Sequence, residues 1–160
     1  MMRTVCKTVF FLSELSDRAR ERALETMRSW PDVYGWSDES LQSIRAFCDH
    51  FGVTLKNYCI GPWSPVEYET DATNANFRGV KMRDIDPGNM PTGYCLDCTL
   101  WETMHREFKR TGDALYAFNQ ALETGFCEWR TDWEDAYSDE QLTELADANG
   151  YEFDENGEKV

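Results

Sequence analysis

Hydrophobic and polar side chains recur with two different periods along the first third of the chain. Residues 4–11 are rich in β-branched and aromatic types at alternating positions, which predicts a strand. Apolar side chains then recur every three or four residues between Ser16 and Trp30, and Ser16 can cap the start of that helix. The same period continues over 37–51, so a second helix capped by Ser37 is expected there.

The rest of the chain predicts a hairpin, three more helices and a last strand. Two β-rich runs, 53–60 and 66–70, flank a Gly-Pro break, which is typical of antiparallel neighbours. The final strand is expected at 151–153. Apolar periodicity predicts a helix over 92–109. Asp113 and Ser138 can each cap a further helix, the second of which is expected to end near Gly150.

These elements predict an α+β fold, in which a small antiparallel sheet (N-terminal strand, central hairpin, C-terminal strand) packs with about five helices. At 41% hydrophobic and 14% aromatic content, residues 1–160 can bury one core and are expected to form a single domain. No apolar run suits a membrane span, and no signal-peptide pattern is found. A cytoplasmic protein with reduced cysteines is therefore expected.

The segment 71–93 has no clear periodicity and predicts a long loop. Arg78, Lys81 and Arg83 make it the one locally basic stretch of an acidic chain. Such a loop either binds something or pairs internally with the acidic end, and we favour the internal pairing.

Negative charge is concentrated in the region 128–160. Twelve carboxylates stand there against only Arg130 and Lys159, so this region holds ten of the chain's fourteen net negative charges. Such a charge repels nucleic acid and attracts the basic surfaces that normally hold it. The sequence thus predicts a protein partner with a basic nucleic-acid-binding surface, without direct nucleic-acid or membrane binding.

The predicted helix after Ser138 would direct Leu142, Leu145 and Ala146 inward and a row of carboxylates outward. Successive members of that row rise roughly 4.5 to 6 Å, within a factor of two of the roughly 3.4 Å per charge of one DNA strand. Nucleic-acid mimicry and a merely solubilising face both stay open. The candidate partner-binding residues are Asp132, Glu134, Asp135, Glu140, Glu144, Asp147, Glu152, Asp154, Glu155, Trp129 and Trp133.

Motifs with recognisable chemistry are few. Cys95 and Cys98 form a CxxC pair, but Cys98 and His105 would lie about 10 Å apart along one helix and cannot share a zinc ion. We interpret the two cysteines as small helix residues. No pattern of nucleophile and base accompanies His50 or His105. We therefore expect no catalytic residue, no metal and no cofactor.

Several segments resemble a family of small phage and prophage proteins, some of which are labelled antitoxin-like. The resemblance lies in Glu14-Leu15-Ser16-Asp17 with the helix that follows, Phe47–Val53, Thr70–Asn74, Pro91–Cys98 and Asn149–Phe153, and so spans most of the chain. It implies a mobile-element context and no particular reaction. In character the chain is also similar to anti-CRISPR and anti-restriction proteins.

Together, charge and resemblance predict a non-enzymatic, phage-encoded inhibitor in the bacterial host cytoplasm. It would bind a basic nucleic-acid-binding surface of a host defence complex or nuclease. One alternative is an antitoxin-like protein that neutralises a toxin by burying an aromatic patch. Another is a small metal or redox protein that uses Cys95 and Cys98.

Overall fold

The computed structural model describes residues 1–30, 33 and 35–160. They fall into two compact units: unit 1 comprises residues 1–34 and 135–160, and unit 2 comprises residues 35–134. The α+β class is confirmed, with five α-helices and short antiparallel strands among the described residues. The single domain expected from composition stays a prediction. Pro31, which directly follows the helix predicted to end at about Trp30 and would stop it, lies outside the described residues.

Unit 1 is built from the two ends of the described sequence. Its elements are β1 (Phe10–Phe11), η1 (Leu12–Glu14), α1 (Asp17–Arg28), α5 (Asp139–Asn149) and β4 (Glu152–Phe153). The predicted caps of both helices are confirmed, because Ser16 accepts a hydrogen bond from the Ala19 N–H and Ser138 accepts one from the Gln141 N–H. Strand β1 pairs antiparallel with β4, with Phe10 opposite Phe153.

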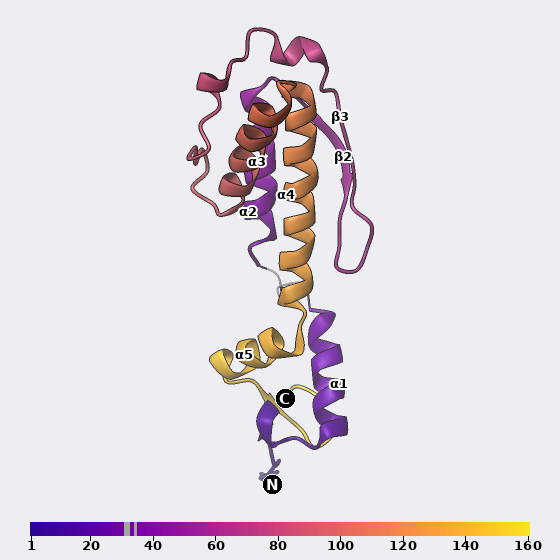
Figure 1. Ribbon diagram of the computed structural model, residues 1–160. Coiled ribbons are helices and arrows are strands. Elements are labelled where there is room, and N and C mark those ends of the chain that lie inside the picture. Colours follow the sequence, from indigo (N-terminus) through magenta and orange to yellow (C-terminus); the bar gives the residue numbers. More distant parts are fainter. Residues whose placement is uncertain (31–32, 34) are drawn as a thin grey trace. The chain divides into compact units, whose positions relative to one another are not determined.

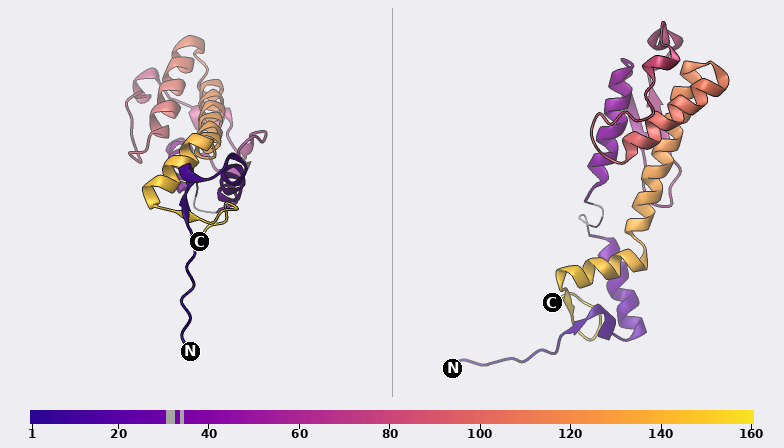
Figure 2. Two further views of the ribbon diagram at one scale, coloured as in Figure 1. Left: turned by 90° about the horizontal axis from the view of Figure 1, so that it is seen from below. Right: turned by 60° about the vertical axis from the view of Figure 1, so that its left-hand side comes forward.

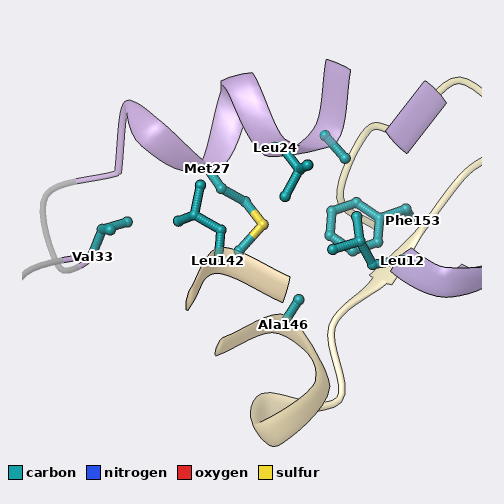
Figure 3. Close-up of a cluster of buried hydrophobic side chains, with 8 residues drawn as sticks. Leu12, Leu24, Met27, Val33, Leu142, Ala146 and Phe153 are labelled. Atoms are coloured by element: carbon teal, nitrogen blue, oxygen red, sulfur yellow. The ribbon is translucent and has the colours of Figure 1, made fainter. Parts of the chain in front are cut away.

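One apolar cluster holds these segments together (Figure 3). Leu12, Met27, Leu142 and Phe153 are each at most 1% exposed, and they come from four different elements. Burying a side chain of this size contributes roughly 1.5–3 kcal/mol relative to leaving it in water. The N- and C-terminal segments of unit 1 are thus joined by shared burial, and not only by the short β1–β4 pair.

Unit 2 has three helices, one hairpin and two short 3₁₀ turns (Figures 1 and 2). Its elements are α2 (Ser37–His50), β2 (Leu55–Cys59), β3 (Glu67–Thr70), η2 (Asn74–Phe77), η3 (Met82–Asp84), α3 (Leu96–Thr111) and α4 (Ala114–Ala136), the last two residues of which belong to unit 1. Asp113 caps α4, as expected, by accepting from the Tyr116 N–H at 3.0 Å.

Aromatic packing forms the core of unit 2. The Phe47 ring of α2 stacks on Phe118 of α4 at 5.2 Å and meets the Trp101 ring of α3 edge-on, also at 5.2 Å. On the other side of α4, the hairpin lies along the helix, where Tyr68 stacks on Phe126 at 4.6 Å. Helices α2, α3 and α4 and the hairpin therefore share one core.

Three sequence-based expectations need correction. One sheet was expected, but the strands of the described residues form two separate two-stranded sheets. The β1–β4 pair belongs to unit 1 and the β2–β3 hairpin belongs to unit 2. Strand β1 covers only Phe10–Phe11 of the predicted 4–11, since β4 offers a partner of just two residues. Ser37 is the first residue of α2 and not its cap, and its hydroxyl accepts a hydrogen bond from the Trp129 indole at 3.2 Å.

The long loop predicted at 71–93 contains only η2 and η3, and side chains pin it to the unit. The Asn76 amide donates to the carbonyl oxygens of Phe51 and Gly52 at 3.1 and 3.2 Å. Phe77 and Ile85 are 7% and 3% exposed. The loop is therefore an ordered part of unit 2. None of the helices in the described part of the chain is both long and apolar enough to cross a membrane.

Gly157 lies where the turn after β4 meets α1. Its φ is +85°, and a Cβ built there would come within 2.1 Å of the Ala19 carbonyl oxygen. Both the left-handed conformation and the closeness of the α1 backbone require glycine. This approach holds residues 154–160 against α1.

Gly157→Ala should therefore destabilise unit 1 by at least about 3 kcal/mol, through a steric clash added to backbone strain. Gly150→Ala is the matched control: φ is +61° there, but no atom lies within 4 Å of the added Cβ. It should cost only about 1–2 kcal/mol. Urea unfolding followed by circular dichroism measures both, and equal losses would show that the contact with α1 is unimportant.

Candidate protein-binding surface

Helix α5 presents the clearest group of exposed carboxylates. Leu142 and Ala146 are 0% and 2% exposed and face the core of unit 1, as the sequence predicts. Glu140, Glu144 and Asp147 are all exposed, and none of them makes an ion pair with a described residue. From Glu140 to Asp147 the helix rises roughly 10 Å, so the three charges form one row along its outer side.

Three other candidate carboxylates of unit 1 are also exposed, and a fourth is used internally. Asp135, Glu152 and Glu155 are exposed. Asp154 is half-buried, and its Oδ1 accepts hydrogen bonds at 2.9 Å from the backbone N–H groups of Asn156 and Glu158. Asp154 thus closes the turn before Gly157, which is a structural task.

Four of the five candidates on α4 lie in unit 2, and they do not form an open acidic face. Glu134 accepts a hydrogen bond from the Trp63 N–H at 2.8 Å and lies 3.8 Å from the Arg130 guanidinium. Asp132 and Trp133 are half-buried. The structure corrects the expectation for Trp129, which is 3% exposed and belongs to the core.

Folding also changes how the charge is distributed. Unit 1 carries 14 acidic and 7 basic side chains in the sequence, and unit 2 carries 16 and 9, so each has a net charge of −7. The charge that is concentrated in 128–160 is balanced in part because the arginine-rich α1 belongs to the same unit as α5. Arg28, for example, pairs with Asp139. Because unit 1 has 60 residues and unit 2 has 100, unit 1 is still the more acidic per residue, but it is far less acidic than the segment 128–160 taken alone.

Arg78, Lys81 and Arg83 are exposed, and none forms an ion pair with a described residue of unit 2. The predicted internal pairing of the loop with the acidic end is therefore not found for residues 128–134, the part of that end that belongs to unit 2. The loop is held instead by its amide and apolar side chains.

The hairpin tip carries an unusual aromatic residue that the sequence analysis did not single out. Trp63 is 67% exposed and has φ of 56°, a left-handed conformation that is strained for a bulky side chain. Glu134 binds its N–H, and Arg130 donates to the Ser64 carbonyl oxygen at 3.3 Å. Two side chains of α4 thus fix the backbone that presents the Trp63 ring.

The CxxC segment has a structural function that sequence reasoning missed. Asp97 is fully buried, and its Oδ2 accepts from the Thr92 N–H, the Thr92 hydroxyl and the Gly93 N–H at 2.8–3.0 Å. This carboxylate fixes the entry into α3. The signal was a Thr-Gly pair followed closely by Asp at a predicted helix start, which is a capping pattern.

Cys95 and Cys98 are free thiols, exposed and half-buried respectively, near the start of α3. His50 is exposed, with its ring 4.8 Å from that of Trp101, and His105 is half-buried. Among the described residues, no three His, Cys, Asp or Glu side chains are arranged to hold a metal ion.

Comparison of the chain with protein-family models, with curated proteins and with solved structures finds no match. The resemblance to phage proteins therefore stays a prediction from sequence motifs.

The environment of Cys48 shifts the acidity of its thiol. Burial, together with the negative charges of Asp49 and Asp71, raises the pKa of the Cys48 thiol to about 12. A raised pKa leaves almost no thiolate at neutral pH, and the thiolate is the reactive form. Iodoacetamide at pH 8 should therefore spare Cys48 in the folded protein while it alkylates the exposed Cys59 and Cys95. Peptide mass mapping measures this, with urea-unfolded protein as the control in which all six should react.

Proposed function

We propose that the protein is a non-enzymatic inhibitor whose α5 carboxylates bind a basic, nucleic-acid-binding surface of another protein. The single observation that carries the proposal is the exposed row of Glu140, Glu144 and Asp147 on α5, none of which makes an ion pair with a described residue. The motif resemblance to phage proteins favours a bacterial defence complex or nuclease as the target, in the manner of anti-CRISPR and anti-restriction proteins.

The physical argument is competition for cationic side chains. A surface that grips a polynucleotide is lined with Lys and Arg, and these cations displace the counterions condensed on the phosphates. A row of carboxylates with several ångströms between charges can take the place of part of that backbone. Helix α5 is suited to this because its apolar side is fixed in the core of unit 1, so the row is held in place before binding.

Reversing the three charges together (Glu140→Lys, Glu144→Lys, Asp147→Lys) should weaken partner binding at least about tenfold. The variant and the wild type are used to capture proteins from a bacterial lysate, and the proteins lost with the variant are identified. With the purified target, duplex DNA should compete with this protein, and binding should weaken as NaCl rises. Equal binding by the triple variant would contradict the proposal.

The matched control reverses three exposed carboxylates of unit 2: Asp49→Lys, Glu102→Lys and Glu123→Lys. Its net charge changes by the same amount, so retained binding would separate a local surface from bulk charge. Lys at position 140 opposes the helix dipole at about 0.3–1 kcal/mol, so circular dichroism must show that both variants remain folded.

A second candidate function is favoured by the Trp63 geometry. An exposed Trp held in a strained backbone by two α4 side chains is typical of a binding anchor, since Trp is enriched in interface hot spots. In this case the protein acts as an antitoxin-like partner that inserts the aromatic hairpin tip into a toxin.

Trp63→Ala distinguishes the two functions. If the hairpin tip is the anchor, this variant should lose about 2 kcal/mol or more of binding free energy, and the association should change little with salt. Tyr116→Ala, which removes an exposed aromatic ring from α4, is the control. Isothermal titration with the captured target measures the binding free energy of both variants. Full affinity of Trp63→Ala would exclude the hairpin tip as the binding anchor.

A further inference from the structure

In unit 1 a lysine ammonium group lies against two aromatic rings and is not paired with a described carboxylate. Lys159 Nζ lies 4.0 Å from the centre of the Tyr151 ring and 5.1 Å from that of Trp30. In a chain with 30 carboxylates, Lys159 makes no ion pair with a described one. The attraction of the ring faces for a cation is therefore what holds this ammonium.

The two rings form a corner. Their centres are 5.5 Å apart and their planes make an angle of 82°, so the ammonium meets two perpendicular walls. Both rings are half-buried against the apolar cluster of unit 1, which fixes their orientation. Trp30 follows the end of α1, with its N–H bonded to the Met27 carbonyl, and Tyr151 follows Gly150, with its N–H bonded to the Ala146 carbonyl.

Open space lies beside the corner with Lys159 in place. A cavity of about 770 Å³ is lined by both rings, by the polar side chains of Arg22, Thr26, Glu158 and Lys159, and by the apolar side chains of Val33 and Leu145. Pockets that bind small molecules or side chains measure roughly 300–1,000 Å³. A side chain several carbons long can therefore enter over apolar walls and bring its cation to the rings.

Lys159 can leave the corner without unfolding its surroundings. Its backbone is bridged to Phe153, and the Val160 N–H donates to the Glu152 carbonyl at 2.9 Å. The residue is exposed, so rotation of its four-carbon side chain would place the ammonium in water. The loss of one exposed cation–π contact costs only about 0.5–1 kcal/mol.

We propose that Trp30 and Tyr151 form a binding site for the ammonium group of a partner's lysine side chain, methylated or not, and that Lys159 occupies this site in the isolated chain. Two perpendicular aromatic walls around a cation are the arrangement by which aromatic cages bind alkylated ammonium groups. The inference goes beyond the carboxylate row of α5 and does not require it, because the rings and not the carboxylates recognise the cation.

The experiment titrates Lys159→Ala with tetramethylammonium chloride or with N-acetyl-lysine N-methylamide and follows the Trp30 indole signal by NMR. That signal is assigned from its loss in Trp30→Phe. Removal of Lys159 vacates the corner, so saturable shifts are expected with dissociation constants on the order of 1–10 mM. The wild type should bind about three- to sixfold more weakly, because Lys159 must first leave the corner at a cost of about 0.5–1 kcal/mol.

The choice of ligand distinguishes the two lysine forms. Shifts with tetramethylammonium alone would identify a methylated lysine, and shifts with both compounds would identify lysine in general. Sodium chloride at the same concentration controls for ionic strength, and Lys56→Ala, which removes a lysine from β2, should bind like the wild type.

Further variants show whether the ring faces are responsible. In the Lys159→Ala background, Tyr151→Phe keeps the ring and should keep binding, whereas Tyr151→Leu should lose it. The α5 triple-lysine variant combined with Lys159→Ala should also bind tetramethylammonium, so failure of the carboxylate proposal leaves this one intact. No saturable shift with either compound in folded Lys159→Ala, or unchanged binding in Tyr151→Leu, would overturn the inference.

Discussion

The burial of Leu142 and Phe153 against Leu12 and Met27 is the interaction on which the rest of unit 1 depends. It joins segments that are far apart in the sequence, and it gives β1 its partner and α5 its floor. Because Leu142 and Ala146 must face this cluster, the helix turns Glu140, Glu144 and Asp147 outward. The exposed charge is thus a consequence of apolar packing.

The same packing limits what charge along the sequence can indicate. An acidic segment predicts an acidic surface only if its neighbours in space are not basic, and here the core places α1, with its several arginines, in the unit that contains α5. The carboxylates that remain candidates for binding a partner are those that make no stabilising contact inside the fold. Glu134 holds the hairpin tip and Asp154 closes a turn, whereas the α5 row has no such task among the described residues.

Local signals in the sequence were sufficient for the helices, because caps such as Ser16, Asp113 and Ser138 act within one turn. Strand pairing was less predictable: the partner of β1 depends on contacts with β4 that no local pattern encodes, so one sheet was expected where the described residues form two. The α5 row followed from helical periodicity. Trp63 and the Trp30–Tyr151 corner could not be found this way, since a positive φ and a ring-to-ring angle arise only from tertiary packing.

The division of unit 1 into two segments, with residues 35–134 between them, affects the order of folding during synthesis. Unit 2 is contiguous, so its aromatic core can assemble while residues 135–160 are still inside the ribosome. Helix α1 emerges first but must wait for Leu142 and Phe153 before its apolar side is covered. If residues 35–134 were a flexible loop, closing it would cost roughly 4 kcal/mol of chain entropy. Once unit 2 has folded, these residues are no longer a flexible loop, and the entropy cost of joining the two segments of unit 1 changes.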